Sequence, residues 1–249
     1  MYEMKCEIKY REYRFETLPS TQFFLREKLH EGEDLLAVAS EQTQGRGTKN
    51  RSFDCGQGGL WFSLLRFHEN TPARDAFLMM ARAAVAVCKT LEKYGLAPKI
   101  KWANDVLVDG KKICGILIEN RLSGGFVESA LVGVGLNVNQ EQFVSDAPNP
   151  ISLSQVIGHE VDREALLKAI TARFFELYQQ YASAILDRTA LHQRYISLLY
   201  RLNIPSTYRD SRSAFTATLR NVELDGRLIL EDQQGTLRSY LFKEIAYII

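Results

Sequence analysis

Residues 41–51, Glu-Gln-Thr-Gln-Gly-Arg-Gly-Thr-Lys-Asn-Arg, combine the residue types of a site that binds an anion. Gly45 and Gly47 let the backbone adopt positive φ and approach a ligand closely, and successive N–H groups on such a loop form an anion-binding nest. The segment also holds three cations that can neutralise phosphates: Arg46, Lys49 and Arg51. No Gly-Lys-Ser/Thr ending is present, so this is not a Walker A loop. On these residues alone, a solvated basic surface loop is an equally good interpretation.

A second candidate group is residues 101–105, Lys-Trp-Ala-Asn-Asp, which is followed closely by Lys111 and Lys112. A lysine beside strand-forming Val and Ile residues can reach into a partly dry site, where its ammonium attracts a phosphate or carboxylate more strongly than in water. Asn104 and Asp105 at the start of a strand could hold a ribose or a metal, or form an Asx turn. One of the two adjacent lysines is expected to lie in solvent at a hairpin.

Residues 133–137, Gly-Val-Gly-Leu-Asn, form the third candidate segment. Two glycines within a strand indicate that a ligand or another part of the backbone comes close. The segment does not match a dinucleotide-binding fingerprint, because the third glycine is missing and no helix follows at once.

The composition restricts the class of protein. The formal net charge is +1, from 31 Lys and Arg against 30 Asp and Glu, so no overall positive field favours nucleic acids. The four cysteines form no Cys-x-x-Cys pair and no histidine lies at zinc-like spacing from them, which predicts neither a metal site nor disulfides. An N-terminal signal region and an apolar run of the ~20 residues that span a membrane are both lacking, so we expect a cytoplasmic protein.

Hydrophobic periodicity predicts the strands and helices that must position these segments. Ser20 is an N-cap signal, Gly95 a helix stop and Asp109-Gly110 a hairpin turn. Three helices are predicted. One begins near residue 20, a second covers 73–94, and a third covers 162–181 with Asp162 as its N-cap. The predicted strands are 8–18, 34–40, 60–67, 99–102, 105–108, 112–118 and 126–137.

The chain changes character after about residue 200. Short β-rich pieces at 215–219, 227–230 and 236–249 are separated by glycine-containing turn signals. We therefore expect two domains, a main domain over residues 1–200 and a small all-β barrel over residues 201–249. The barrel is too small to be stable alone and should dock on the main domain.

Taken in order, these segments resemble the biotin–protein ligase family. The matching pieces are Ser20-Thr21, Gln42-x-x-Gly45-Arg46-Gly47, Lys101-Trp102-x-Asn104-Asp105, Lys112-x-x-Gly115-Ile116-Leu117 and Gly133-x-Gly135-x-Asn137. They run through nearly the whole chain, and residues 226–249 are similar to the family's small SH3-like domain. The Lys-Trp-x-Asn-Asp motif followed by Lys-x-x-Gly-Ile-Leu is the specific part, whereas the glycine loop alone would not identify the family.

The resemblance implies a fold and a reaction. The fold is α/β (α+β), a mixed β-sheet with helices packed on one face, as in class II aminoacyl-tRNA synthetases and biotin ligases, plus a C-terminal SH3-like β-barrel. In the reaction, the biotin carboxylate attacks the α-phosphorus of ATP and gives biotinyl-5′-AMP and pyrophosphate. A lysine of a biotin carboxyl carrier domain then attacks the mixed anhydride. The implied small molecules are biotin, ATP and Mg²⁺, and the carrier protein is the implied partner.

The resemblance also implies roles for individual residues. Lys112 would lie between the biotin carboxylate and the α-phosphate and offset the charge that develops in the transition state. Asp105 would help to hold Mg²⁺ or orient the incoming lysine, and Arg46 with its neighbouring backbone would close over the ligand. The other residues implied to contact the biotin ring or the nucleotide are Ser20, Thr21, Gln22, Gln42, Gly45, Gly47, Lys49, Arg51, Phe53, Lys101, Trp102, Asn104, Gly115 and Asn137.

Several positions depart from the family pattern. The second arginine of the usual Gly-Arg-Gly-Arg is Thr48, which puts tight retention of the adenylate in question, although two nearby cations can compensate. The usual tryptophan after the loop is Phe53, which can still stack on adenine, and the usual proline before Asn104 is Ala103. Residues 45–59 would form a mobile flap that orders over the ligand.

Other interpretations stay open. A lipoate or octanoate ligase or transferase shares the catalytic fold but lacks the Lys-Trp-x-Asn-Asp signature. A non-catalytic biotin sensor or repressor would need a DNA-reading element, and Ser20-Thr21 lie too near the start of the sequence to leave room for a helix-turn-helix domain, so we expect no specific DNA binding. A simple binding module would have to match five ordered segments by coincidence. The resemblance is compatible with a homodimer.

Overall fold

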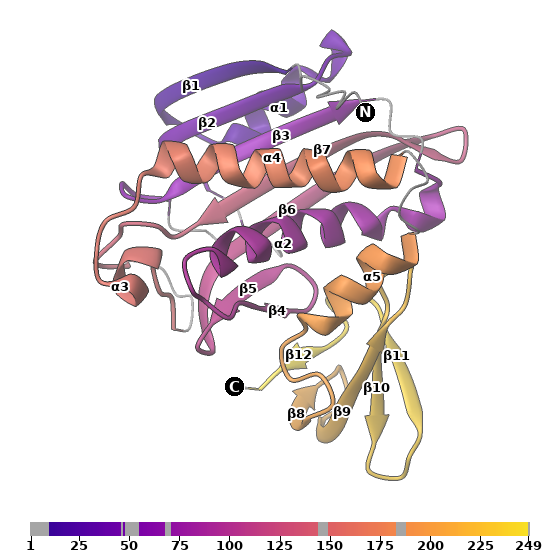
Figure 1. Cartoon of the computed structure of the whole chain (residues 1–249). Helices are drawn as coiled ribbons and strands as arrows, with labels where there is room; N and C mark the ends of the chain where they lie inside the picture. Colours follow the sequence, from indigo (N-terminus) through magenta and orange to yellow (C-terminus); the bar gives the residue numbers. More distant parts are fainter. Residues whose placement is uncertain are drawn as a thin grey trace, which may run out of the picture.

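The scaffold of the molecule is a seven-stranded mixed sheet (Figure 1). The computed structural model describes residues 10–45, 47, 55–67, 71–143, 149–182 and 188–248. The strand order is β1-β2-β3-β7-β6-β5-β4, with β1 parallel to β2 and every other pair antiparallel. The bounds are β1 Arg11–Leu18, β2 Leu35–Gln42, β3 Leu60–Phe67, β4 Lys99–Lys101, β5 Asp105–Val108, β6 Lys111–Ser123 and β7 Phe126–Leu136. All seven predicted strands are confirmed over the described residues, β6 runs farther than predicted, and residues 8 and 9 of the first predicted strand lie outside the described residues.

The long helices α2 (Phe77–Glu92) and α4 (Arg163–Ala182) cover one face of this sheet (Figure 1). Alternate residues of each strand supply the apolar core beneath them, and in β7 these are Val132, Val134 and Leu136. The predicted mixed sheet with packed helices is therefore confirmed.

The short helix α1 (Thr21–Glu27) lies against the opposite face. Its Leu25 belongs to a second, smaller core, whose other members are Leu35, Ala37, Leu65 and Leu131. The resemblance implied helices on a single face. This additional layer arises because α1 follows β1 directly and lies back over β2, β3 and β7.

Capping and turn signals account for where several elements begin and end. Ser20 precedes α1 with extended backbone, and its hydroxyl accepts the N–H of Phe23, as an N-cap does. The carboxylate of Asp162 accepts two backbone N–H groups of the first turn of α4. Asp109 and Gly110 both have positive φ, which the tight turn between β5 and β6 requires. These predicted signals are confirmed.

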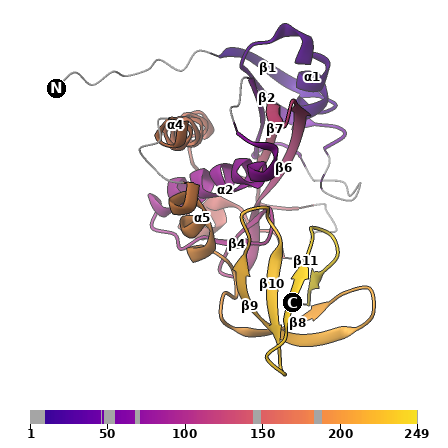
Figure 2. The same ribbon diagram turned by 90° about the vertical axis from the view of Figure 1, so that its right-hand side faces the viewer.

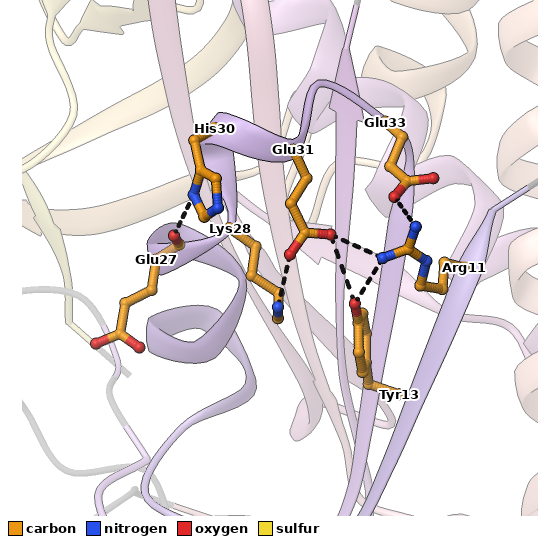
Figure 3. A network of polar contacts seen from close by, with 7 residues as sticks. All are labelled: Arg11, Tyr13, Glu27, Lys28, His30, Glu31 and Glu33. Atoms are coloured by element: carbon orange, nitrogen blue, oxygen red, sulfur yellow. Dashed lines mark hydrogen bonds and ion pairs between the residues drawn. The ribbon is translucent and has the colours of Figure 1, made fainter.

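A network of charged side chains holds the end of α1 against β1 (Figure 3). Glu31, in the 3₁₀ turn η1 (Leu29–Glu31) after α1, accepts hydrogen bonds from Lys28 at 2.6 Å and from Arg11 of β1 at 3.1 Å. Arg11 also pairs with Glu33. The hydrogen bond from Lys28 is the main cause that lowers the pKa of Glu31. Charged residues on β1 also suit an edge strand, because they discourage pairing with another chain.

Two further helices, α3 (Leu153–Ile157) and α5 (Arg188–Ser197), were not predicted. A capping box starts α3, in which Ser152 and Gln155 each bond the other's backbone N–H. α5 packs against α2 and leads toward the C-terminal part of the chain (Figure 1). Of the helices in the described ranges, none has both the length and the apolar character needed to cross a membrane.

A five-stranded antiparallel sheet forms the C-terminal part (Figure 2). The strand order is β11-β10-β9-β8-β12. The bounds are β8 Pro205–Arg209, β9 Ala214–Val222, β10 Leu228–Asp232, β11 Leu237–Tyr240 and β12 Ala246–Tyr247. The β-rich character predicted after residue 200 is confirmed. Closure into an SH3-like barrel and a domain boundary between residues 200 and 201 stay predictions.

The chain enters the C-terminal sheet along the edge strand β4. The N–H of Ile100 donates to the carbonyl of Leu198 at 2.7 Å, and its carbonyl accepts the N–H of Tyr200 at 2.8 Å. Beside this junction, the indole N–H of Trp102 donates to the carbonyl of Gly226 at 3.0 Å. The second sheet is thus attached to the strand that carries Lys101, one of the candidate site residues.

Candidate functional site

Strand pairing places two glycines side by side on the sheet face opposite α2 and α4. Gly115 of β6 pairs with Gly135 of β7, and the same row continues to Trp61 of β3 on one side and to Asp105 of β5 on the other. The residues flanking Gly135 in β7 point into the core beneath α2 and α4, so Gly135 belongs to the opposite face. Because glycine has no side chain, a ligand can approach the backbone of β6 and β7 closely here.

A β-bulge brings Lys112 to the same face. Strict alternation along β6 would put Lys112 on the core side together with Cys114. The register between β5 and β6 shifts by one residue, however, and Leu107 pairs with Lys112. The extra residue, Ile113, is fully buried in the core, and Lys112 turns toward Asp105.

Lys112 and Asp105 form an ion pair on this face. Nζ of Lys112 lies 2.7 Å from Oδ1 of Asp105, and the two side chains are 23% and 24% exposed. Partial burial makes this attraction stronger than that of a fully exposed pair. Lys101 pairs with Asp105 in the β4–β5 ladder, and its ammonium lies 5.6 Å from the ring centre of Tyr247. β4 and β6, the two strands that flank β5, thus each carry a lysine in the rows beside Asp105.

Neutral polar groups gather where α1 meets β2 and β3. Oε1 of Gln42 accepts the backbone N–H of Thr21 at 2.7 Å and lies 3.1 Å from the Thr21 hydroxyl. The same hydroxyl lies 2.8 Å from the hydroxyl of Ser63, and Nε2 of Gln42 donates to Sγ of Cys55 at 3.1 Å. If Thr21 donates to Gln42, then Ser63 donates to Thr21, so the network has one consistent direction.

Gln22 lies over the other glycine of β7. A Cβ atom built on Gly133 would lie 2.8 Å from Oε1 of Gln22, so only glycine leaves room for this side chain. Nε2 of Gln22 lies 3.4 Å from the carbonyl of Leu117, a long hydrogen bond. α1 thus presents two consecutive polar side chains, Thr21 and Gln22, to the sheet face that carries the glycines.

The two polar groups are chemically different and lie on either side of the paired glycines. Neutral donors and acceptors come from α1, β2 and β3, whereas the lysines and their carboxylate come from β4, β5 and β6. Such an arrangement suits a ligand with a neutral hydrogen-bonding head and an anionic end. The lysines can also attract a second anion and stabilise negative charge that builds up between the two.

Residues 15–137 match the family model described as the biotin/lipoate A/B protein ligase family. A bifunctional ligase/repressor BirA of Bacillus spizizenii is 32% identical over 215 residues, which cover 84% of this chain and 65% of that protein. A biotin–[acetyl-CoA-carboxylase] ligase of Paracoccus denitrificans is 28% identical over 211 residues, which cover 80% of this chain and 84% of that protein. Residues 15–137 thus carry the domain of the biotin/lipoate A/B protein ligase family.

A solved structure is similar to this chain in fold. A biotin protein ligase from Aquifex aeolicus, determined in complex with biotin and ATP, superposes with a TM-score of 0.76 at 24% identity. The match covers 95% of this chain and 97% of that one, so both the main sheet and the C-terminal sheet lie within it. At 24% identity this similarity establishes the fold alone, and it assigns no ligand contact to a residue of this chain.

The family fold brings together most of the described residues that the sequence nominated. Those on the face with the paired glycines are Thr21, Gln22, Gln42, Lys101, Asp105, Lys112 and Gly115. Ser20 lies directly before them, is 5% exposed, and uses its hydroxyl as the cap of α1. Its role is therefore to start the helix that carries Thr21 and Gln22.

Three nominated residues use polar side-chain atoms for bonds within the fold, and their contacts with a ligand stay predictions. Trp102 is buried, stacks edge-on against Phe242 and donates to the C-terminal sheet. Asn104 donates to the carbonyl of Ile116 at 2.7 Å and so holds the corner between β4 and β5. Asn137 is 4% exposed and uses its side chain within the fold. In the structure these three side chains support the backbone around the site.

The remaining nominated residues belong to the glycine-rich segment. Arg46, Lys49, Arg51 and Phe53 lie outside the described residues. Gly45 and Gly47 are described and belong to no helix or strand. After β2 the segment passes next to the start of α1. There the N–H groups of Thr43 and Gln44 donate to the carbonyls of Leu18 and Pro19. A flap over residues 45–59 therefore stays a prediction.

Two site residues were missed in the sequence. Ser63 is 1% exposed and bonds Thr21, and Cys55 is 4% exposed and accepts from Gln42. Ser63 had a detectable signal, since it is the one uncharged polar residue in the apolar strand Leu60–Phe67, and a buried hydroxyl needs a partner. Cys55 had no such signal, because nothing in the sequence relates it to Gln42.

Proposed function

We propose that this chain is an ATP-dependent biotin–protein ligase, which forms biotinyl-5′-AMP and transfers the biotinyl group to a lysine of a biotin carboxyl carrier domain. The observation that carries the proposal is that the Thr21–Gln42 group and the Lys112–Asp105 pair share one sheet face across paired glycines. The name of the Paracoccus relative, biotin–[acetyl-CoA-carboxylase] ligase, supports the same substrate, and that of the Bacillus relative, a ligase/repressor, supports a ligase activity.

The neutral polar group fits the ureido ring of biotin. That ring offers two N–H donors and one carbonyl acceptor, and Thr21, Gln42 and Ser63 supply hydroxyl and amide groups of both kinds. The dithiolane ring of lipoate, which the wider family also includes by name, offers neither. A site built to hydrogen-bond one ring would leave buried polar groups unpaired against the other, and this favours biotin strongly.

In the first step, a carboxylate oxygen of biotin forms a bond to the α-phosphorus of ATP, and the bond to the bridging oxygen breaks as pyrophosphate leaves. Both reactants are anions, so their approach needs a cation that is already in place. Lys112 supplies this charge. Its ammonium leaves Asp105 and contacts the biotin carboxylate and the α-phosphate instead. Lys101, on the other side of β5 from Lys112, attracts the rest of the phosphate chain.

In the second step, the neutral amine of the carrier lysine attacks the acyl carbon of the adenylate. The new C–N bond becomes the amide, AMP leaves with the electron pair of the acyl–oxygen bond, and the nitrogen loses its extra proton to solvent. Asp105 would orient the incoming amine, because its carboxylate lies 2.7 Å from the ammonium that binds the α-phosphate.

Mg²⁺ is expected to accompany ATP, but the described side chains do not fit a dedicated metal site. No group of three or more His, Cys, Asp or Glu among them could hold an ion. Asp105 is paired with Lys112 at 2.7 Å, and a divalent cation at that carboxylate would lie next to an ammonium. We therefore assign Asp105 to Lys112 and leave any Mg²⁺ to the phosphate oxygens.

The proposed function is tested by incubating the chain with biotin, α-labelled ATP and a purified biotin carboxyl carrier domain. We expect biotin on the carrier, with labelled AMP released in equal amount. Parallel reactions contain lipoate or octanoate in place of biotin. Absence of any modified carrier, or modification by lipoate or octanoate and not by biotin, would overturn the proposal.

A further inference from the structure

The backbone of Lys112 is held by the short segment that precedes α3. β7 ends at Leu136, so it does not reach Lys112 at the beginning of β6. Residues 149–151 take its place. The N–H of Lys112 donates to the carbonyl of Asn149, and the carbonyl of Lys112 accepts the N–H of Ile151, both at 2.9 Å. These bonds lie beside the bulge that turns Lys112 to the site.

Two buried amide side chains tie this segment to β6. Nδ2 of Asn137 donates to the carbonyl of Ile151 at 3.1 Å and lies 3.4 Å from the carbonyl of Lys112. Oδ1 of Asn137 accepts from Nε2 of Gln140 at 3.2 Å, and Oε1 of Gln140 accepts the N–H of Val138 at 2.8 Å. Every polar atom of both amides is therefore used, which sets the orientation of each.

We propose that Asn137 and Gln140 are positioning residues that fix where the ammonium of Lys112 lies. The inference rests on the proposed function, because it assumes that this ammonium meets both anions. A bulge can shift along a strand, and a shift by one residue would turn Lys112 toward the core. Asn137 bonds the carbonyls of Lys112 and Ile151 beside the bulge and Gln140 orients Asn137, so together they hold the register. Asn137 thus acts on the reaction through Lys112.

The test compares two glutamines of the same stretch of chain. Gln140→Met keeps the length of the side chain and removes both hydrogen bonds. Gln155→Met is the matched control, since Gln155 also bonds two backbone groups nearby but touches neither Asn137 nor Lys112. We measure biotin-dependent exchange of labelled pyrophosphate into ATP. We expect kcat to fall on the order of 10-fold in Gln140→Met, with KM for biotin within about 2-fold, and little change in Gln155→Met.

A purely structural role is separated from positioning by a double-mutant cycle with Lys112→Ala. If Gln140 acts through Lys112, Gln140→Met causes no further loss of kcat in the Lys112→Ala background. Equal losses in both backgrounds, or a wild-type kcat in folded Gln140→Met, would overturn the inference. Should Gln140→Met fail to fold, Gln140→Glu is used, because it keeps the acceptor for Val138 and lacks the amide donor to Asn137. A wild-type rate in Lys112→Ala would instead refute the role of Lys112 in the proposed function.

Discussion

Lys112 owes its place beside Asp105 to one extra residue in β6. The bulge lets two consecutive residues, Ile113 and Cys114, both point into the core, and the residue before them then faces the other side. The result is a lysine with a partly buried ammonium and a nearby carboxylate, a combination suited to gathering anions and then releasing them. Chemistry at the residue scale therefore depends on this local irregularity in the sheet.

Replacing Lys112 with Ala should lower the rate of adenylation by on the order of 10², because a charge that stabilises the transition state is lost. The rate is followed by pyrophosphate exchange. Lys111→Ala is the matched control, since Lys111 is exposed at the hairpin and should exchange at nearly the wild-type rate. Equal rates for the two variants would show that Lys112 is not the stabilising charge.

Ser63→Ala should weaken biotin binding by about 5- to 10-fold, which corresponds to one hydrogen bond of about 1 kcal/mol. The hydroxyl of Thr21 loses its partner at 2.8 Å and its orientation toward the ligand. Titration calorimetry gives the affinity, and kcat at saturating biotin should stay unchanged. Ser129→Ala removes another buried serine, from β7, and should leave the affinity as it is. The same loss in both variants would assign the effect to general destabilisation.

Individual residues were the least predictable part of the site. Lys112, Asp105, Thr21 and Gln42 could be nominated by their motifs. The buried position of Trp102 could not be predicted from the sequence, because its partner carbonyl is on Gly226, more than a hundred residues away along the chain. Asn104 and Asn137 illustrate the same limit, since a motif marks a residue as important without showing whether its polar atoms face a ligand or the backbone. The bulge at Ile113, finally, leaves no mark on the pattern of residues.

At the scale of elements, α1 is the piece that assembles the neutral half of the site. It begins at Ser20, and its first two residues, Thr21 and Gln22, point to the sheet while Leu25 anchors the helix in the smaller core. A seven-residue helix is unstable by itself, so contacts with the sheet and with β1 must hold it.

Gly133→Ala tests the close contact of α1 with β7. The added Cβ would lie 2.8 Å from Oε1 of Gln22, which is the movable end of a side chain, so the fold should persist while Gln22 is displaced. We expect biotin affinity to fall several-fold, on the order of one lost hydrogen bond, with a nearly unchanged melting temperature. In a Gln22→Ala background the glycine substitution should have little further effect. A further loss of similar size there would contradict this explanation.

Glu31→Gln tests the network that holds the end of α1 to β1 (Figure 3). The pKa of Glu31 is lowered in the folded protein, chiefly by Lys28, so its charged form is favoured by folding. A depressed pKa means that the stabilisation is present above the ordinary pKa of about 4.5 and is lost as the pH falls through the folded value. The variant should therefore have a lower urea midpoint than the wild type at pH 7, and the difference should shrink as the pH falls below the ordinary pKa of the carboxyl group. A difference that persists unchanged in acid would contradict the assignment.

Elements were predictable where periodicity and capping agree. The seven strands, α2 and α4 follow from alternating or helical spacing. The starts of α1 and α4 follow from Ser20 and Asp162, and the turn between β5 and β6 follows from Asp109-Gly110. α3 and α5 escaped prediction because they are short and lack a clear apolar stripe. The face that α1 covers depends on how the chain turns after β1, which periodicity does not encode.

At the scale of the whole molecule, two sheets meet at the short strand β4 (Figure 2). Trp102 fills this junction, with its ring against Phe242 and its N–H on Gly226, and Tyr247 of the C-terminal sheet lies near Lys101. The C-terminal sheet therefore supports the strand that carries one of the site's lysines. A change at the junction should affect both stability and the nucleotide side of the site.

Trp102→Ala should destabilise the fold by about 3–5 kcal/mol, as for a large buried aromatic side chain. Trp102→Phe keeps an aromatic ring and removes the bond to Gly226, so its cost should be nearer 1–3 kcal/mol. Urea unfolding followed by circular dichroism measures both. If Trp102→Ala unfolds at the wild-type midpoint, the junction does not depend on this residue.

The most direct test of the central claim is a crystal structure of the chain with biotinyl-5′-AMP bound. We expect the ureido ring to lie within hydrogen-bond distance of Thr21 and Gln42 and the phosphate to contact Lys112. The rest of the ligand should lie across Gly115 and Gly135. A ligand bound on the side of α2 and α4, or one that leaves Thr21 and Lys112 without contact, would contradict it.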